Sequence, residues 1–311
     1  MSEAMPAIDV RGLVKRYGSR TVVDHVDLKL MPGRICGFLG PNGSGKTTTL
    51  RLICGLLTPD AGEGTCLGED IITGRDAIKR QTGYMTQKFG LYEDLTIREN
   101  LDFVARVYRL DRIAERVDQA LERLGLASRQ NQLTGTLSGG WKQRLALTAC
   151  VLHEPKLLLL DEPTAGVDPK ARRAFWDEIH SLAAGGMTVL VSTHYMDEAE
   201  RCHEIAYIVY GKLMARGTAE EVVEASQLKA WIATGPGADR LAPVLRDAPG
   251  VTAAAAFGTA LHVCGPDAAA LEKAIAPYRQ NRGLAWRKAG ATLEDVFIHL
   301  MGQVRDNAEA A

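Results

Sequence analysis

The chain has 311 residues, of which 46% are hydrophobic and 24% carry a charge. These values allow a substantial buried core and predict a globular protein with one large domain and one small one. The 37 basic residues almost balance the 38 acidic ones, so the formal net charge is only -1. This balance excludes a general electrostatic attraction to nucleic acid or to anionic lipid.

The sequence also lacks the apolar segments of a membrane-spanning or secreted chain. No apolar run approaches the roughly 18 residues that suggest a transmembrane helix. The N-terminal stretch MSEAMPAIDV has no signal-peptide core, so we expect a chain that cannot cross a bilayer alone. The cysteines lack the spacing of a zinc site or a disulfide framework, which predicts reduced thiols in the cytoplasm. They are Cys36, Cys54, Cys66, Cys150, Cys202 and Cys264.

The first elements are predicted to be strands. Residues 8–30 contain short runs of alternating or β-branched residues around Gly18 and Ser19, which predicts antiparallel strands joined by a turn. Residues 34–39 form an apolar run that leads into a glycine-rich segment, and residues 47–53 have the apolar spacing of a helix. The sequence therefore predicts a strand, a loop and a helix in direct succession.

The middle of the chain alternates helical and strand patterns. Residues 97–126 repeat apolar positions at helical spacing with charges between them, which predicts two amphipathic helices in a helical subdomain of about residues 88–150. Residues 156–160 and 187–191 are apolar runs typical of buried strands, and residues 171–182 between them have a helical pattern. This alternation predicts a parallel sheet covered by helices.

After about residue 226 the composition shifts to Ala, Gly and Pro, and the apolar pattern starts again. The predicted order there is strand, helix, strand, strand, helix, strand and a last helix. We therefore expect a large domain over residues 1–225 and a small α+β domain, of the ferredoxin-like βαββαβ type, over residues 226–311. The closing residues 306–311, DNAEAA, are expected to fray.

The glycine-rich segment has the pattern of a phosphate-binding loop. Residues 40–47, GPNGSGKT, match G-x-x-x-x-G-K-[ST] between a predicted strand and a predicted helix. Glycines let backbone amides and the helix N-terminus approach phosphate oxygens, with Lys46 on the β- and γ-phosphates and Thr47 on Mg²⁺. A turn that only caps a helix is the alternative. The candidate residues are Gly40, Pro41, Asn42, Gly43, Ser44, Gly45, Lys46, Thr47 and Thr48.

Two acids follow a predicted strand at the position where open α/β sheets bind ligands. Asp161 is suited to hold Mg²⁺ through a water molecule, and Glu162 to orient and deprotonate the water that attacks the γ-phosphate. His194 also follows a predicted strand and could donate a hydrogen bond to the γ-phosphate or to this water. Without the phosphate loop, the acids would be interpreted as solvated carboxylates at a turn.

Residues 137–140, LSGG, complete a set of motifs that resembles the ATP-binding cassette (ABC) family over about residues 8–225. The resemblance implies that this tetrapeptide opens a helix and faces the γ-phosphate of ATP held by a second subunit. Ser138 and the amides of Gly139 and Gly140 suit that role because they can donate hydrogen bonds to an anion. Taken alone, the tetrapeptide could also be a flexible turn.

The resemblance implies roles for four further residues. Tyr17 would stack on adenine, and Gln87 would touch Mg²⁺ and link the site to a membrane partner. Asp168 would anchor the segment that crosses the dimer interface, and His194 would be the switch histidine. Trp141 departs from the glutamine that the family commonly has there. The phosphate-facing residues precede it, so we expect activity to survive this departure.

The resemblance also implies a fold, an activity and partners. The fold is an α/β P-loop NTPase core of the ABC type, with an antiparallel β subdomain and a helical subdomain, followed by the small domain. The activity is hydrolysis of ATP, with Mg²⁺, coupled to transport. The partners are a transmembrane permease and a second copy or homologue of this subunit, with no nucleic acid. The chain would bind the cytoplasmic side of the plasma membrane peripherally, through the permease.

Two segments narrow the resemblance further. Residues 91–101, LYEDLTIRENL, and residues 292–301, TLEDVFIHLM, are similar to ATPase subunits of bacterial drug and polyketide exporters. This favours export of drug-like or other small hydrophobic substrates. The small domain could equally be an appendage that stabilises a dimer.

Two rival functions make different demands on the sequence. A soluble ATPase of the same superfamily that acts on DNA or ribosomes would usually carry a coiled-coil insertion, a zinc insertion or a second cassette. The sequence shows none of these. A P-loop kinase or GTPase would need an acceptor pocket or a guanine-reading tetrapeptide and would leave the LSGG segment unexplained. Transport therefore remains the favoured function.

Overall fold

The computed structural model describes residues 5–281 and 283–303. The tail 306–311, which the sequence predicts to fray, lies outside these ranges. The chain divides into two compact units, the first of which ends at Leu213, while the second begins at Met214. Each unit has apolar cores of its own, and each is described by itself.

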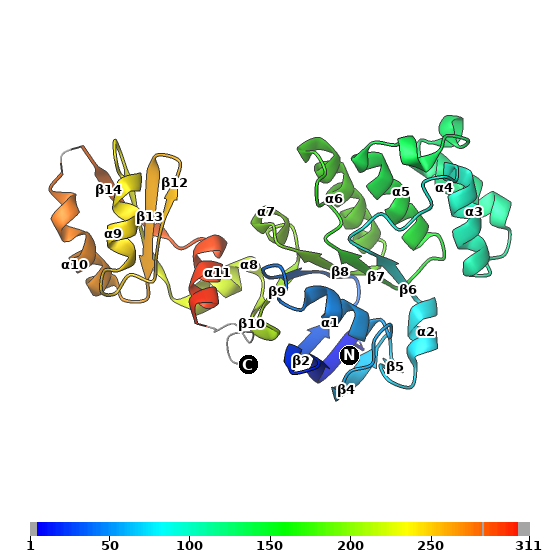
Figure 1. Cartoon of the computed structure of the whole chain (residues 1–311), viewed down its shortest axis with the longest axis horizontal. Coiled ribbons are helices and arrows are strands. Elements are labelled where there is room, and N and C mark those ends of the chain that lie inside the picture. Colours follow the sequence, from blue (N-terminus) through cyan, green and yellow to red (C-terminus); the bar gives the residue numbers. More distant parts are fainter. Residues whose placement is uncertain (1–4, 282, 304–311) are drawn as a thin grey trace. The chain divides into compact units, whose positions relative to one another are not determined.

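A six-stranded sheet forms the centre of the first unit, with the strand order β10-β9-β3-β8-β7-β6 (Figure 1). The strands from β9 to β6 pair in parallel, which confirms the predicted parallel sheet. The strands are β3 (Ile35–Leu39), β6 (Thr82–Met85), β7 (Leu157–Asp161), β8 (Thr188–Thr193), β9 (Glu204–Val209) and β10 (Lys212–Gly217).

Layers cover both faces of this sheet (Figure 1). One face carries α1 and an antiparallel sheet with the order β2-β1-β4-β5, as the first strands of the sequence predict. The other face carries α5 and α6. The elements are β1 (Ile8–Tyr17), β2 (Arg20–Leu30), α1 (Lys46–Ile53), β4 (Ala61–Cys66), β5 (Glu69–Asp70), α2 (Arg75–Arg80), α5 (Gly139–Val151), α6 (Pro169–Ala184) and α7 (Met196–Ala199).

Alternate residues of the central strands point into two separate apolar cores. Leu157 and Leu159 of β7 belong to the core that contains α1, whereas Leu158 and Leu160 belong to the core that contains α6. All four leucines are fully buried. A strand covered on both faces needs apolar side chains at every position, which explains the continuous apolar run in the sequence.

A group of helices in the middle of the chain has a third core of its own. Its first helix, α3 (Ile97–Val107), begins with a capping box: the Glu99 carboxylate accepts the Thr96 N–H at 2.8 Å, and the Thr96 hydroxyl accepts the Glu99 N–H at 3.2 Å. α4 (Ile113–Leu124) follows, and α5 packs against both helices. The two amphipathic helices predicted for residues 97–126 are therefore present.

The second unit contains a four-stranded antiparallel sheet with the order β12-β13-β11-β14. One of its apolar cores joins the sheet to α9 and α10, and α11 packs against α8. The elements are α8 (Ala219–Ser226), β11 (Lys229–Thr234), α9 (Ala242–Arg246), β12 (Ala253–Phe257), β13 (Ala260–Gly265), α10 (Ala268–Arg279), β14 (Ala285–Gly290) and α11 (Leu293–Gly302).

One helix of the small unit is shorter than the sequence pattern predicts. The helical pattern covers residues 238–247, but the structure has a 3-10 turn over Asp239–Leu241 followed by the five residues of α9. Pro243 lies in the first turn of α9. Proline has no N–H to donate to the preceding turn, so it is tolerated at the start of an α-helix and not inside one.

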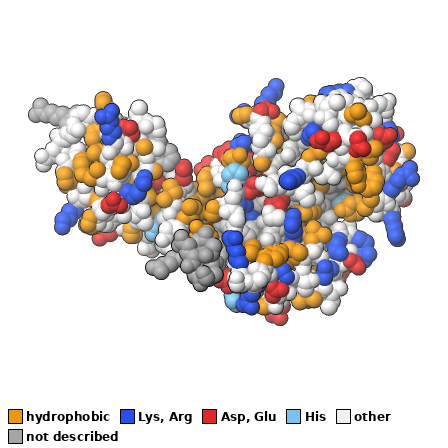
Figure 2. All heavy atoms as spheres, in the orientation of Figure 1, with side chains coloured by type: hydrophobic (Ala, Val, Ile, Leu, Met, Phe, Trp, Pro, Cys, Tyr) orange, Lys and Arg blue, Asp and Glu red, His pale blue; other side chains and the backbone are white. Residues whose placement is uncertain are grey.

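The surface has no field of a single charge on the face drawn in Figure 2, where basic, acidic and apolar side chains are interspersed. This agrees with the formal net charge of -1. Within the described residues, no helix is both long and apolar enough to span a membrane.

The last helix offers a test of how the small unit is held together. Phe297 of α11 is 1% exposed, whereas its neighbour Ile298 is 37% exposed. We expect Phe297→Ala to lower the free energy of unfolding by about 3–5 kcal/mol because it removes a buried ring. Ile298→Ala, the matched control, should change it by less than about 1 kcal/mol. Denaturant titration followed by circular dichroism measures both values, and equal losses would contradict this packing.

Candidate functional site

The predicted phosphate loop lies between the carboxyl end of β3 and the start of α1. Gly40 and Gly45 have φ values of +156° and +96°, and an added Cβ would lie 2.1 Å from the Ile208 carbonyl oxygen and 2.4 Å from the Val22 carbonyl oxygen, respectively. Only glycine fits at these two positions. The buried hydroxyl of Ser44 has no hydrogen-bond partner among the described residues. The loop therefore presents an unpaired donor within a backbone cradle.

Lys46 points into the same loop. Its side chain is only 5% exposed, and Nζ donates hydrogen bonds to the Gly40 carbonyl at 2.7 Å and the Pro41 carbonyl at 3.1 Å. Burial lowers the pKa of the Lys46 ammonium, while the carboxylates of Glu162 and Asp161 act in the opposite direction. A desolvated ammonium of this kind favours the approach of a further anion.

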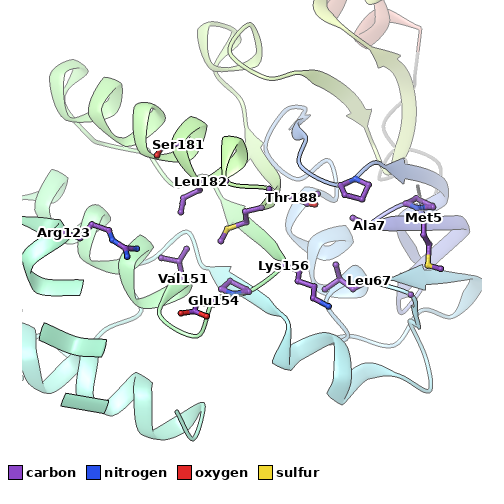
Figure 3. Close-up of a pocket in the computed structure, with 17 residues that line it drawn as sticks. Met5, Ala7, Leu67, Arg123, Val151, Glu154, Lys156, Ser181, Leu182 and Thr188 are labelled. Atoms are coloured by element: carbon purple, nitrogen blue, oxygen red, sulfur yellow. The ribbon is translucent and has the colours of Figure 1, made fainter. Parts of the chain in front are cut away.

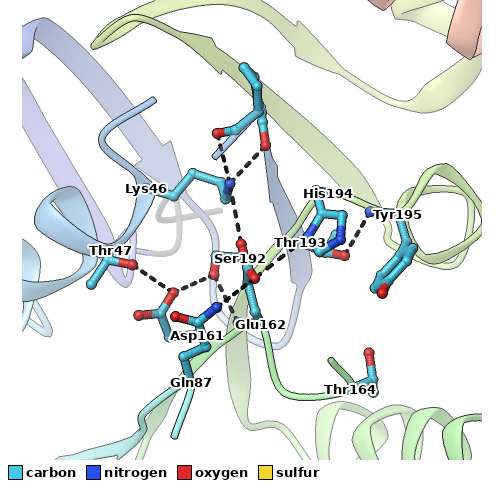
Figure 4. A network of polar contacts seen from close by, with 12 residues as sticks. Lys46, Thr47, Gln87, Asp161, Glu162, Thr164, Ser192, Thr193, His194 and Tyr195 are labelled. Atoms are coloured by element: carbon cyan, nitrogen blue, oxygen red, sulfur yellow. Dashed lines mark hydrogen bonds and ion pairs between the residues drawn. The ribbon is translucent and has the colours of Figure 1, made fainter. Parts of the chain in front are cut away.

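Three hydroxyl groups surround Asp161 at the end of β7, and Figure 4 shows those of Thr47 and Ser192. The hydroxyls of Thr47 and Ser192 donate to Asp161 Oδ1 at 3.0 Å and 2.7 Å, and the Tyr84 hydroxyl lies 3.5 Å from Oδ2. Asp161 itself is 2% exposed. These bonds compensate a carboxylate that would otherwise lose its hydration on burial.

Glu162, the next residue, is held by three side chains (Figure 4). Gln87 Nε2 donates to Glu162 Oε2 at 2.9 Å, Lys46 Nζ lies 3.5 Å from Oε1, and His194 Nδ1 lies 3.5 Å from Oε2. The backbone of Glu162 has φ +48°, and its N–H donates to the Ser192 carbonyl at 3.1 Å. A non-glycine residue in this region costs about 1–3 kcal/mol. Such strain clusters at functional sites, and the surroundings here hold it in place.

The structure brings six of the side chains that the sequence singles out into one network, to which Gly40 and Pro41 contribute their carbonyls. Lys46, Thr47, Gln87, Asp161, Glu162 and His194 form the network in Figure 4. Among the described contacts, this network does not reach Tyr17, Ser138, Gly139, Gly140 or Asp168.

The predicted residues outside the network have positions of their own. Tyr17 ends β1 and is 51% exposed. Ser138 precedes α5, and Asp168 caps α6 by accepting the N–H groups of Lys170 and Ala171 at 3.1 Å and 3.0 Å. The Ser138 hydroxyl makes no capping hydrogen bond to α5. The amino ends of both α5 and α6 thus lie outside the network of Lys46 and Glu162.

Sequence reasoning missed Ser192 as a site residue. The β7–β8 register pairs Asp161 with Ser192, so the hydroxyl and the carboxylate meet at the same edge of the sheet. The available signal was a hydroxyl residue at the carboxyl end of a second apolar run, one position before Thr193 and two before His194. Strand order, which fixes that β8 lies beside β7, could not be read from the sequence.

A cavity of about 610 Å³ lies at the opposite edge of the sheet (Figure 3). Lys156 directly precedes β7 and Thr188 begins β8, so their side chains mark the amino ends of these strands. Asp161 and Ser192 stand at the carboxyl ends of the same strands. This cavity therefore does not include the phosphate loop or the acid pair.

The site also suits a divalent cation. Mg²⁺ is usually bound by one or two protein oxygens together with phosphate oxygens and water. The Thr47 hydroxyl and the Asp161 carboxylate lie 3.0 Å apart and supply oxygens of this kind beside the phosphate loop. Over the described ranges, no cluster of three or more His, Cys, Asp or Glu side chains could hold a metal ion. The donor set thus fits a cation that is bound by oxygens of both the protein and a nucleotide.

Comparisons with known proteins agree with this geometry. The family model described as ABC transporter matches residues 23–165. The chain is 37% identical over 322 residues to the daunorubicin resistance ATP-binding protein DrrA3 of Streptomyces coeruleorubidus, an alignment that covers 98% of this chain and 99% of that one. The chain belongs to the ATP-binding subunits of ABC transporters.

Other ABC proteins are similar over different shares of their length. The Nod factor export ATP-binding protein I of Burkholderia pseudomallei (strain 1710b) is 38% identical over 304 residues, covering 95% of this chain and 97% of that one. The probable multidrug ABC transporter ATP-binding protein YbhF of Escherichia coli (strain K12) is 45% identical over 217 residues, or 69% of this chain. The alignment covers only 38% of the length of YbhF.

Solved structures support the ABC fold of the first unit. A structure described as the ATP-binding subunit of an ABC transporter matches with a TM-score of 0.64 and 30% sequence identity, over 70% of this chain and 92% of that one. A nucleotide-free ATP-binding cassette matches with a TM-score of 0.63 and 26% identity, over 71% and 94%. The ABC-type α/β core with its antiparallel subdomain, expected from the sequence, is thereby confirmed.

The role of Ser192 in this ABC site can be tested. Ser192→Ala removes a hydrogen bond to a buried carboxylate, which is worth about 1.5–3 kcal/mol. We expect ATP turnover to need a higher Mg²⁺ concentration, or to fall about tenfold at saturating Mg²⁺. Ser181→Ala, an exposed serine of α6, is the control. Turnover of Ser192→Ala that matches the control across a Mg²⁺ titration would remove Ser192 from the site.

Proposed function

We propose that this chain binds and hydrolyses ATP as one of two subunits that close head to tail around two nucleotides, and that this closure moves a separate membrane permease. The observation that carries the proposal is the set of contacts around Glu162. One carboxylate meets the phosphate-loop lysine, a glutamine from the loop after β6 and a histidine after β8. These contacts place Glu162 beside Lys46, on the side where the γ-phosphate would lie, and a general base must be within reach of the water that attacks there.

The residues of the phosphate loop fit a triphosphate. The Ser44 hydroxyl is buried without a partner in the described part of the chain, and Lys46 is a desolvated cation beside it. The backbone amides of the loop and of the start of α1 add further donors for negative oxygens. ATP binding would draw Lys46 away from the Gly40 and Pro41 carbonyls and toward the β- and γ-phosphates.

Hydrolysis would then depend on the groups beside Lys46. Once its ammonium contacts the γ-phosphate, Glu162 is free to accept a proton from the attacking water. Gln87 and His194 would hold Glu162 and the water in line with the γ-phosphate. Thr47, Gln87 and Asp161 would hold Mg²⁺, which when bound would neutralise charge on the phosphate oxygens.

The second subunit would complete the site. Gly139 has open space at its Cβ position, and the Ser138 hydroxyl makes no capping bond to α5, so both can face a phosphate from outside. In this proposal Ser138, Gly139 and Gly140 of one subunit contact the ATP held by the other subunit. Asp168 anchors the segment between the subunits, and Tyr17 stacks on adenine. Gly40–Thr48 of each subunit hold the phosphates.

The direction of transport follows from the relatives. Two relatives that align over nearly the whole chain have names that describe daunorubicin resistance and Nod factor export. We therefore assign the chain to export of drug-like or other small hydrophobic molecules. It would act at the cytoplasmic side of the plasma membrane, bound through the permease.

An apolar surface on the middle helices is the candidate for permease contact. Tyr92, Phe103 and Val107 are 52%, 43% and 60% exposed, and the rings of Tyr92 and Phe103 meet edge to face at 5.2 Å. Val104 and Tyr108 on the same helix border an apolar pocket of about 160 Å³ together with Phe89 and Leu91. Exposed apolar groups that gather in this way mark interaction surfaces. This surface follows Gln87 in the chain, the residue that the resemblance links to a membrane partner.

We assign the small domain to the ferredoxin-like class that the sequence predicts. Its strands and helices succeed one another as β11, α9, β12, β13, α10 and β14, and its sheet has the order β12-β13-β11-β14. This order supports the βαββαβ assignment. We assign residues 1–225 to the nucleotide-binding domain and residues 226–311 to an accessory domain.

The assigned base can be tested directly. Glu162→Gln should bind ATP with unchanged affinity and form a stable dimer in the presence of MgATP. Turnover should fall about 10²–10⁴-fold because the proton acceptor is lost. Glu154→Gln, a carboxylate at the far edge of the sheet, is the control and should turn over normally. Light scattering with and without ATP measures dimer formation, and phosphate release measures turnover. Full turnover of Glu162→Gln would refute the assignment.

The docking surface can be tested by co-expression with the permease subunit of the same transporter. Val107→Asp and Phe103→Asp should abolish co-purification with the co-expressed permease while ATP binding remains, because a charge is introduced into an apolar contact. Val244→Asp places the same charge at an exposed valine of α9 and should leave co-purification intact. Normal co-purification of the α3 variants would exclude this surface. Binding to ribosomes or DNA instead of the permease would exclude transport altogether.

A further inference from the structure

A carboxylate with no exposed surface lies behind the site. Glu198 belongs to α7, the short helix that follows β8 and His194, and its exposed fraction is 0%. Burying a carboxylate is costly unless its oxygens are paired, so such a group persists only where several partners surround it. The motifs of the sequence assign no task to Glu198, and it does not touch the residues of the phosphate loop in the described contacts.

The partners of Glu198 come from three different segments. Oε2 accepts a hydrogen bond from the Thr193 hydroxyl at 2.6 Å, and Oε1 accepts one from the Thr164 hydroxyl. The guanidinium of Arg172, on α6, lies 3.7 Å from Oε1. Arg172 also lies over the ring of Tyr195 at 4.4 Å, so its position is fixed on more than one side. Glu198 thus joins β8, the segment after β7 and the first turns of α6.

Each of these segments carries a residue of the proposed catalytic cycle. Thr193 directly precedes His194 in the chain. Thr164 follows Glu162 by two positions and begins the turn that leads to Asp168. Arg172 belongs to the helix that Asp168 caps. The Glu198 carboxylate therefore links two parts of the proposed site. One is His194, which would lie beside the attacking water, and the other is the intersubunit segment that contains Asp168. A shift of either part can displace the other through Glu198.

Hydrogen bonds on both sides restrict Thr193 in particular. Its hydroxyl donates to Glu198 and also accepts the N–H of Tyr195 at 3.0 Å. The chain is thereby fixed immediately before and after His194, whose Nδ1 lies 3.5 Å from Glu162 Oε2. Without the carboxylate, the hydroxyls of Thr193 and Thr164 would be left as buried donors with no acceptor, and the turns that carry them would have to rearrange.

We propose that Glu198 is a positioning residue that couples His194 to the segment from Thr164 to Asp168. This inference rests on the proposed function, in which His194 and Glu162 act on the attacking water and Asp168 lies between two subunits. Through Glu198, closure of the dimer on the Asp168 segment brings His194 into register with the γ-phosphate. Glu198 has no exposed surface and does not touch the phosphate loop in the described contacts, so its effect falls on turnover and on closure and not on the first binding of ATP.

The primary test replaces the two hydroxyl donors while keeping their shape. Thr193→Val and Thr164→Val should each lower kcat on the order of 10-fold to 100-fold, because a displacement of about 1 Å at the reacting groups has effects of this size. The KM for ATP and the affinity for ATP without turnover should stay within about twofold of the wild type. Thr193→Ser and Thr164→Ser keep the hydroxyl and should restore most of kcat.

Thr188→Val provides the matched control at the other end of β8. Thr188 is 2% exposed, and its hydroxyl accepts the Gly33 N–H at 3.1 Å, far along the strand from the acid pair. The control loses a buried hydroxyl as Thr193→Val does, and its kcat should stay at the wild-type value. A fall in kcat equal to that of Thr193→Val would indicate a general effect on the strand and would overturn the proposal.

Glu198 itself is tested in the Glu162→Gln variant, which separates a failure of the proposed function from a failure of the coupling through Glu198. With Glu162→Gln alone, ATP should trap the dimer, and a failure here counts against the proposed function. Adding Glu198→Gln should weaken the trapped dimer at least about tenfold, because the Asp168 segment loses its fixed position. If the double variant is trapped as tightly as Glu162→Gln, the coupling is absent while the proposed function stands. Should Glu198→Gln fail to fold, Thr164→Val in the same background gives the same decision.

Discussion

The first unit depends on the compensation of charges where the carboxyl ends of β3, β7 and β8 meet. Asp161 ends a strand whose other side chains are fully buried, and Glu162 follows it, so their charges lie at the edge of an apolar interior. Lys46 forms an ion pair with Glu162, and the hydroxyl groups of Thr47 and Ser192 donate hydrogen bonds to Asp161. The glycines of the loop permit this because they let the backbone and the lysine come close enough.

Much of this arrangement could be predicted from the sequence, for a physical reason. The phosphate loop and the acid pair are local: each consists of adjacent residues beside an apolar run, and the run itself indicates a strand buried on both faces. The change to Ala, Gly and Pro after residue 226 likewise indicated a second, smaller domain. Short-range patterns of this kind survive folding because neighbouring residues in the chain remain neighbours in space.

Other features depend on strand order and on packing at long range, which the sequence does not display. Ser192 acts on Asp161 only because β8 pairs with β7, and the three partners of Glu198 lie 5, 26 and 34 positions away from it in the chain. The shortened α9 shows the converse case, in which a local rule, the proline in the first turn, outweighed the helical periodicity of residues 238–247. The left-handed backbone of Glu162 also has no sequence signature, because glutamate rarely adopts it.

The hydrogen bonds of Lys46 bear on which anions the loop can admit. An ammonium group has three N–H donors. In this structure two of them point to the Gly40 and Pro41 carbonyls, and Glu162 lies on the remaining side. An anion that binds the ammonium must replace these contacts. A triphosphate chain can do so, because it carries oxygens on three adjacent phosphorus atoms that can take the places of the two carbonyls and the carboxylate. The contacts of Lys46 thus compensate a buried charge between one nucleotide and the next.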